Sequence, residues 1–135
     1  MAKRGKLFEK QVHETLTKYG YEAISEKSVR IYDGFRPWKT DFVASKNNKL
    51  VVMEVKEQHS DGSTRDKLDG SFRKLRKISK QFNAEGAVFV YSGKKLTEYI
   101  ETHPFVKEIM ADYPDINVMS FSEMENRLAV TGSLI

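Results

Sequence analysis

The sequence contains no cysteine among its 135 residues. This absence excludes a disulfide scaffold, a zinc site built from thiolates and a cysteine nucleophile. A metal in this protein must therefore be held by oxygen or imidazole ligands. The three histidines, His13, His59 and His103, are scattered and lack the spacing of a zinc site or of an HNH-type nuclease.

The sequence also lacks a long apolar run. Its mean hydropathy is −0.56, and no stretch approaches the roughly 18 apolar residues that a spanning helix needs, so we expect no membrane span. No apolar segment follows the basic residues near the N-terminus, which argues against a secretory signal and for a cytoplasmic protein. With 39% apolar and 31% charged residues, we expect one domain over residues 1–135.

Charge is distributed unevenly along the chain. The formal net charge is +4, but residues 64–83 hold seven basic side chains against two acidic ones. Residues 98–126 hold seven acidic side chains against one basic one. This asymmetry suggests one face that meets a polyanion and another turned away from it, although a solvated charged helix explains such a run equally well.

Hydrophobic periodicity predicts an alternation of helices and strands. Helices are expected over Lys6–Lys18 and Thr64–Phe82, then from Pro104 with Phe105, Ile109 and Tyr113 facing the core, and finally from a capping box formed by Ser122 and Glu125. Strands are expected near Val29 and Ile31, with Ala23-Ile24 as a further candidate part of the same strand, and over Thr40–Ser45, Leu50–Lys56, Gly86–Tyr91 and Ile116–Phe121. This order predicts an α/β sandwich with a mixed sheet.

Asn47-Asn48 favours a tight turn that joins two of these strands into a hairpin. Residues equidistant from the turn lie opposite each other, so Asp41 is expected to face Glu54, with Lys56 on the same side of the sheet as Glu54. Two opposed carboxylates repel, and burying either one unpaired costs several kcal/mol. A hard divalent ion such as Mg²⁺ resolves this conflict.

Lys56 beside such an ion could orient or deprotonate a water, or stabilise the negative charge of a transition state. Together with Asp41 and Glu54 it forms an apparatus suited to phosphodiester hydrolysis. The pattern is loose, however, and Glu54 and Lys56 could instead decorate an edge strand while Asp41 caps its start.

At these residues the sequence resembles the PD-(D/E)XK nuclease superfamily, the fold of many restriction enzymes and Holliday junction resolvases. The resemblance covers about residues 5–91 and rests on Lys39-Thr40-Asp41, on Glu54-Val55-Lys56 and on Glu9 in the first helix. It implies a three-layer sandwich with a central mixed sheet and an αβββαβ core. One departure is Thr40, which stands where the family usually has proline.

By this resemblance, Asp41 and Glu54 are metal ligands, Lys56 is the catalytic lysine, and Glu9 is a further metal or water ligand. The implied cofactor is Mg²⁺, with Mn²⁺ as a substitute. Gln58 matches a glutamine that some members carry two residues after the lysine. From spacing alone, Glu9 could equally be a solvated surface residue.

Basic and aromatic residues near these motifs are candidates for nucleic-acid contacts. Arg36, Trp38 and Lys39 come just before Asp41 and combine stacking with phosphate binding, although Trp38 could instead pack on the sheet. The helix after the motif strand supplies candidate phosphate contacts in Arg65, Arg73, Lys74 and Lys77.

These observations predict a nuclease domain over residues 1–135, a metal-dependent DNA endonuclease that works through Asp41, Glu54 and Lys56. Cutting both strands of a duplex with one such centre per chain calls for a homodimer. Two alternatives stay open: a nucleic-acid-binding or assembly module with a nuclease-like fold, and an RNA-processing nuclease. The sequence does not distinguish among duplex sites, junctions, ends and single strands as substrates.

Overall fold

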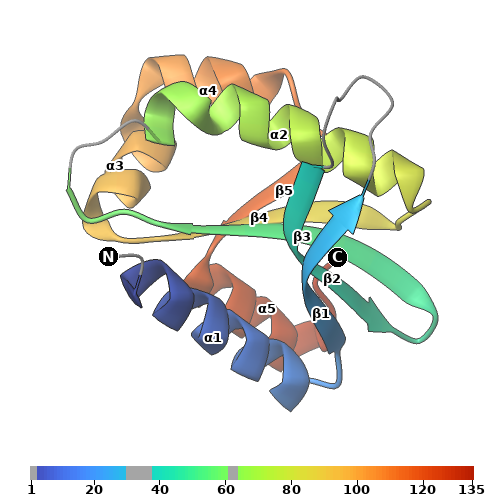
Figure 1. Ribbon diagram of the computed structural model, residues 1–135. Helices are drawn as coiled ribbons and strands as arrows, with labels where there is room; N and C mark the ends of the chain where they lie inside the picture. The colour runs from blue at the N-terminus through green and yellow to red at the C-terminus, as the bar shows by residue number, and fades with distance from the viewer. Residues whose placement is uncertain (1–2, 30–37, 61–63) are drawn as a thin grey trace.

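The computed structural model describes residues 3–29, 38–60 and 64–135. Figure 1 shows the helices and strands in chain order, coloured from blue at the N-terminus to red at the C-terminus. The elements are α1 (Lys3–Lys18), β1 (Glu22–Val29), β2 (Trp38–Lys46), β3 (Lys49–Glu57), α2 (Thr64–Gln81), β4 (Gly86–Ser92), α3 (Lys94–Thr102), α4 (Pro104–Ala111), β5 (Ile116–Ser120) and α5 (Phe121–Thr131).

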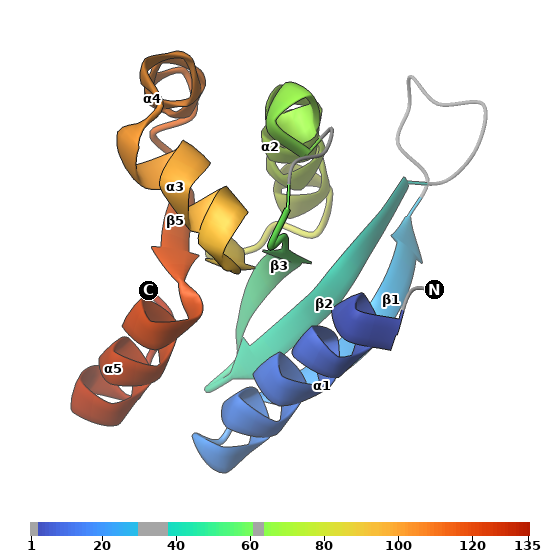
Figure 2. The same cartoon turned by 90° about the vertical axis from the view of Figure 1, so that its left-hand side faces the viewer.

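The five strands form one mixed sheet in the order β1-β2-β3-β4-β5. Strands β1, β2 and β3 pair antiparallel, while β3, β4 and β5 pair parallel. Helices α1 and α5 cover one face, and α2, α3 and α4 cover the other (Figure 2). The predicted three-layer α/β sandwich with an αβββαβ core is therefore confirmed.

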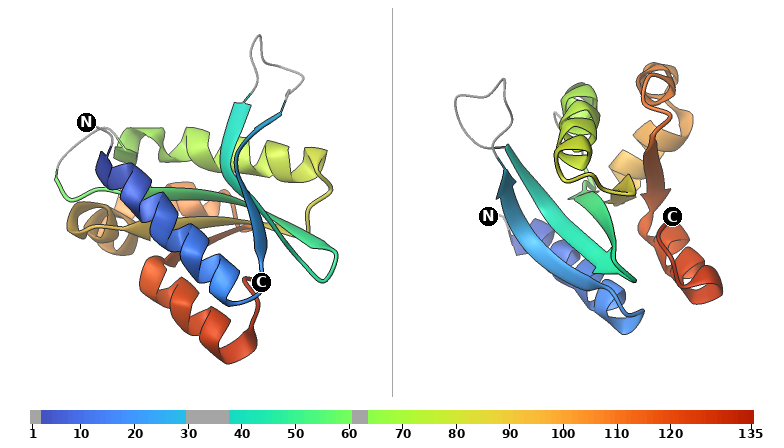
Figure 3. Two further views of the ribbon diagram at one scale, coloured as in Figure 1. Left: turned by 60° about the horizontal axis from the view of Figure 1, so that its bottom comes forward. Right: turned by 90° about the vertical axis from the view of Figure 1, so that its right-hand side faces the viewer.

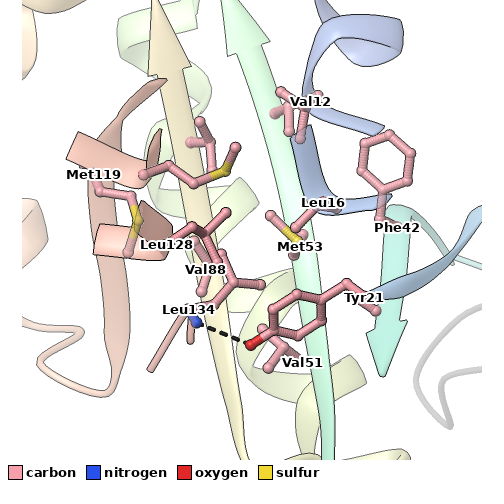
Figure 4. Packing of buried hydrophobic residues seen from close by; sticks show 14 of the residues in the cluster. Val12, Leu16, Tyr21, Phe42, Val51, Met53, Val88, Met119, Leu128 and Leu134 are labelled. Carbon is pink, nitrogen blue, oxygen red and sulfur yellow. Dashed lines mark hydrogen bonds between the residues drawn. The ribbon is translucent and has the colours of Figure 1, made fainter. Parts of the chain in front are cut away.

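Each face of the sheet has its own apolar core because side chains alternate along the strands. On β3, Val51, Met53 and Val55 point toward α1 and α5, and Val52 packs toward α2. Figure 4 shows the first of these cores, where the backbone N–H of Leu134 donates to the Tyr21 hydroxyl at 2.9 Å. The C-terminal segment is thus part of this core.

The predicted hairpin between β2 and β3 is confirmed. Asn47 and Asn48 have φ of 54° and 63°, the left-handed conformation that a type I′ turn requires at both central positions. The register runs from Lys46–Lys49 to Phe42–Met53, as expected from the position of the turn. A local turn signal therefore sets the strand register.

The C-terminal half differs from the sequence-based expectation at two points. The structure has a helix, α3, that was not expected, and its buried residues are Leu96, Tyr99 and Ile100. Phe105 of α4 is 54% exposed instead of facing the core, where Val106 takes its place. The α4 helix does start at Pro104, as predicted.

The last helix begins two residues earlier than the sequence suggested. Ser120 and Glu123 form the capping box, rather than Ser122 and Glu125. The earlier start lets Phe121 pack against Phe8 of α1, with ring centroids 5.6 Å apart in an edge-to-face arrangement. Figure 3 shows α1 and α5 together on the same side of the sheet.

Most of the acidic segment lies on the same face as the basic helix, contrary to the charge pattern, and only its end in α5 lies across the sheet. Helix α2 lies on the same face as α3 and α4, and Arg76 forms an ion pair with Asp115 and stacks on Tyr113. The basic helix is thus partly neutralised by its acidic neighbours. Within the ranges described above, no helix has the length and apolar character needed to cross a bilayer.

Candidate active site

The sheet opens between β2 and β3 beyond the pair Phe42–Met53. On the far side of that pair, β2 stays paired with β1 as far as Trp38, and β3 stays paired with β4 as far as Glu57. Figure 2 shows the two strands together at their hairpin and apart at the other end. The polar motif residues lie where the strands separate.

Two side chains replace backbone pairing at this point. The Thr40 hydroxyl donates to the Met53 carbonyl at 2.7 Å, and the Val55 N–H donates to Asp41 Oδ2 at 2.8 Å. Asp41 therefore does not form the direct strand pair with Glu54 that the register predicted. Its carboxylate is instead fixed by the backbone of β3. Thr40 is 1% exposed, so the residue that departs from the family pattern has a structural role here.

An open cavity of about 370 Å³ lies at this separation. It is bordered by α1, β2, β3 and α2, and it brings together the four predicted catalytic residues, Glu9, Asp41, Glu54 and Lys56. The remaining lining residues are Phe8, Lys39, Val55, Glu57, Ser71 and Lys74. These four residues come together in space from three elements, α1, β2 and β3.

Glu54 is the most deeply buried of the acids, with a residue exposure of 3%. Lys74 Nζ of α2 lies 2.5 Å from Glu54 Oε1. A buried carboxylate needs such a partner because an isolated charge in the interior costs several kcal/mol. The sequence analysis placed Lys74 among the phosphate contacts, whereas the structure pairs it with Glu54 inside the cavity.

Asp41 is in an environment that disfavours its negative charge. Burial raises the pKa of Asp41 from 3.8 to about 6, and the charges of Glu54 and Glu9 act in the same direction. The hydrogen bond from Val55 and the charge of Lys74 oppose this increase and offset only part of it. An additional cation in the cavity would therefore stabilise the ionised form of Asp41.

The donor set suits a hard cation. Asp41 and Glu54 offer carboxylate oxygens, and Mg²⁺ is commonly held by one or two carboxylates together with waters and substrate phosphates. Across residues 3–29, 38–60 and 64–135, no three Asp, Glu or His side chains are grouped closely enough to hold a metal by themselves. Glu9 borders the same cavity without completing such a group.

The other predicted contacts are dispersed. Lys39 is exposed at the cavity wall, Arg73 is exposed on α2, and Lys77 is half-buried. Gln58 is half-buried outside this cavity and donates to the Ser60 carbonyl at 2.7 Å. Arg36 lies outside the described residues, as do the side chains of Trp38 and Arg65 and the predicted strand residue Ile31.

Sequence reasoning missed two features of the cavity. Ser71 was not considered, and Lys74 was not recognised as the partner of Glu54. A signal was present, because the fully buried residues Leu68, Phe72 and Leu75 mark the inner stripe of α2. Ser71 and Lys74 are one position from that stripe and one helical turn apart, which places both at the edge of the core.

No protein-family model and no curated protein matches the sequence. Among solved structures, the fold is similar to a crystal structure of a protein of unknown function, AF1548, with a TM-score of 0.56 and 13% identity over 84% of this chain and 56% of that one. It is also similar to Pyrococcus furiosus SfsA in complex with Ca²⁺, with a TM-score of 0.51 and 14% identity over 86% of this chain and 55% of that one. The chain spans little more than half the length of either structure.

Proposed function

We propose that the protein is a metal-dependent endonuclease of the PD-(D/E)XK type that hydrolyses phosphodiester bonds in DNA. The observation that carries the proposal is the cavity at the divergence of β2 and β3, where Asp41, Glu54 and Lys56 meet. Their strand positions and spacing match the family motif on which the sequence resemblance rests. The similarity to two solved structures supports the fold on which such a site is built.

In this proposal, Asp41 and Glu54 hold Mg²⁺ or Mn²⁺, and Glu9 binds the ion or one of its waters. Asp41 Oδ2 already accepts the Val55 N–H, so that bond orients the carboxylate toward the cavity. Burial, together with the charges of Glu54 and Glu9, raises the pKa of Asp41, and a bound cation would stabilise its ionised form. Ca²⁺ in the complex of P. furiosus SfsA is likewise a hard ion that prefers oxygen ligands.

When bound, the ion supplies electrostatic stabilisation of the phosphate oxygens. Lys56 contributes an ammonium group in the same cavity, where it orients the attacking water or stabilises the charge that develops on the phosphate. Lys39 at the cavity wall and Arg73 on α2 are exposed and contact the flanking phosphates. One centre per chain cuts one strand at a time, so cleavage of both strands uses a homodimer.

A second candidate follows from the Lys74–Glu54 ion pair. An ammonium group at 2.5 Å already neutralises one of the two proposed ligands. If this pairing is permanent, the chain is a nucleic-acid-binding module with a nuclease-like fold. This candidate predicts DNA binding that is independent of divalent metal and no cleavage.

A cleavage assay separates the two candidates. Linear, nicked, branched and single-stranded DNA, with RNA as a parallel substrate, are incubated with the protein in Mg²⁺ or Mn²⁺. We expect cleavage by the wild type and its loss in Asp41→Ala, Glu54→Ala and Lys56→Ala, each still folded by circular dichroism. Lys49→Ala is the matched control, because Lys49 is an exposed lysine at the opposite end of β3.

The pattern of activity decides the outcome. Full cleavage by the three site variants would contradict the proposed mechanism, as would cleavage in excess chelator. Cleavage of RNA alone would replace DNA as the substrate class. Metal-independent DNA binding without any cleavage would favour the binding module.

A further inference from the structure

The ion pair between Lys74 and Glu54 joins two side chains with very different access to solvent. The side chain of Glu54 is 5% exposed, and that of Lys74 is 28% exposed. Glu54 is on the central strand β3, which is paired with β4 on one side, and its position is therefore fixed. Lys74 reaches the cavity from α2 by a flexible four-carbon stem.

We propose that Lys74 is a displaceable counter-ion that occupies Glu54 in the metal-free protein and competes with the divalent ion for that carboxylate. This inference rests on the proposed metal site and assigns Lys74 a regulatory part in it. Lys74 thereby lowers the affinity of the site for metal. It acts on the metal through Glu54 and is not a catalytic residue.

The charges at the site explain why one cation replaces the other. Glu54 and Asp41 repel each other, and the charge of Lys74 stabilises the ionised form of Asp41 as well. Without metal, Lys74 reduces the repulsion between the two carboxylates. A divalent ion between them neutralises the same charge, and the ammonium group is then repelled from it.

The geometry lets Lys74 leave without disturbing the fold. The apolar stripe of α2, which includes Phe72 and Leu75 at 0% exposure, stays packed while only the lysine side chain changes rotamer. Because part of that side chain already contacts solvent, its ammonium group can become hydrated. Glu54 has no such route, so the exchange moves the lysine and leaves the carboxylate in place.

The first test uses the unmodified wild-type protein. Limited lysine acetylation followed by peptide mass spectrometry measures the reactivity of each lysine without metal and with saturating Mg²⁺. We expect acetylation of Lys74 to rise several-fold when Mg²⁺ is bound. Lys67 is the internal control, because it is exposed on the same helix and should react equally in both conditions.

The second test measures Mn²⁺ binding by calorimetry in Lys74→Met, Lys74→Arg and the control Lys67→Met. Removing the competing charge should tighten binding in Lys74→Met by on the order of tenfold. Lys74→Arg keeps the charge and should bind no more tightly than the wild type. In metal-free buffer, Lys74→Met should melt at a lower temperature than Lys67→Met, and saturating Mn²⁺ should recover the difference.

The outcomes separate this inference from the proposed function. If the wild type binds metal but Lys74 stays protected and Lys74→Met binds no more tightly than Lys67→Met, the inference fails and the nuclease proposal stands. If only Lys74→Met binds metal, the competition is supported and the binding module replaces the nuclease. If no variant binds metal, both proposals fail.

Discussion

Asp41→Asn should make the metal-free protein more stable at neutral pH, even though it removes a proposed metal ligand. Asparagine has nearly the same shape as aspartate, and its side-chain oxygen can still accept the Val55 N–H. It resembles the protonated form of Asp41 and carries no charge. The variant therefore removes the cost of an ionised carboxylate in this cavity and little else.

The size of the effect follows from the pKa of Asp41, which burial raises from 3.8 to about 6. The folded state binds the proton of Asp41 more tightly than the unfolded state does. Asp41 therefore destabilises the fold increasingly as the pH rises from its pKa in the unfolded state to its pKa in the folded state. A difference of roughly two pKa units lowers the free energy of unfolding by about 3 kcal/mol at pH values above both pKa values. At about pH 4.5 the penalty is only about 1 kcal/mol, because Asp41 is then protonated in the folded state.

Urea denaturation in chelator at about pH 4.5 and pH 8 measures this difference. The stability advantage of Asp41→Asn over the wild type should grow by about 2 kcal/mol between the two conditions. Titrations of groups that do not interact with Asp41 are common to both proteins and cancel in the comparison. An advantage that is constant with pH, or that shrinks toward pH 8, would refute the claim that burial and acidic neighbours disfavour the ionised form.

Three further predictions concern metal, nucleic acid and the C-terminus. Saturating Mg²⁺ should raise the melting temperature of the wild type, because a ligand that binds only the folded state stabilises it. Chelator should stop cleavage without loss of the circular dichroism signal. In a catalytically inactive background, the double variant Lys39→Gln, Arg73→Gln should bind DNA more weakly whatever its sequence. Fluorescence anisotropy at several salt concentrations should show that the slope of log K against log salt is shallower by about two units. An unchanged slope would place the DNA elsewhere on the protein. Leu134→Ala should lower the free energy of unfolding by about 2–5 kcal/mol, measured by urea denaturation, because Leu134 is fully buried beside Tyr21. Ile135→Ala should lower it far less, because Ile135 is 43% exposed. Equal losses in the two variants would contradict this account of the C-terminal segment.

The features predicted correctly from the sequence depend on local signals. The Asn47-Asn48 turn requires left-handed backbone at two adjacent residues, and that requirement alone fixes the register of the β2–β3 hairpin. This register places Asp41 and Glu54 just beyond its last pair, Phe42–Met53, where both border one cavity. The long helices were found from their apolar stripes.

The features that were missed depend on tertiary contacts or on competing local signals. Which cation of α2 reaches Glu54 depends on how that helix lies over β3, and a charge count cannot show this. The sequence at the start of α5 contains two overlapping capping-box patterns. The structure forms the earlier one, and packing of Phe121 on Phe8 favours it. Helix α3 could have been found, because Leu96, Tyr99 and Ile100 have helical spacing.

The hydrogen bond from Val55 to Asp41 gives the protein an intrinsic reporter of the state of its cavity. Most amides of β3 exchange with solvent only when strand pairing opens, but the acceptor of the Val55 amide is a side-chain carboxylate. Protonation of that carboxylate weakens the bond, and a cation bound there changes the electron density on its oxygen. The chemical shift and hydrogen-exchange rate of this single amide should therefore follow the charge and occupancy of the cavity.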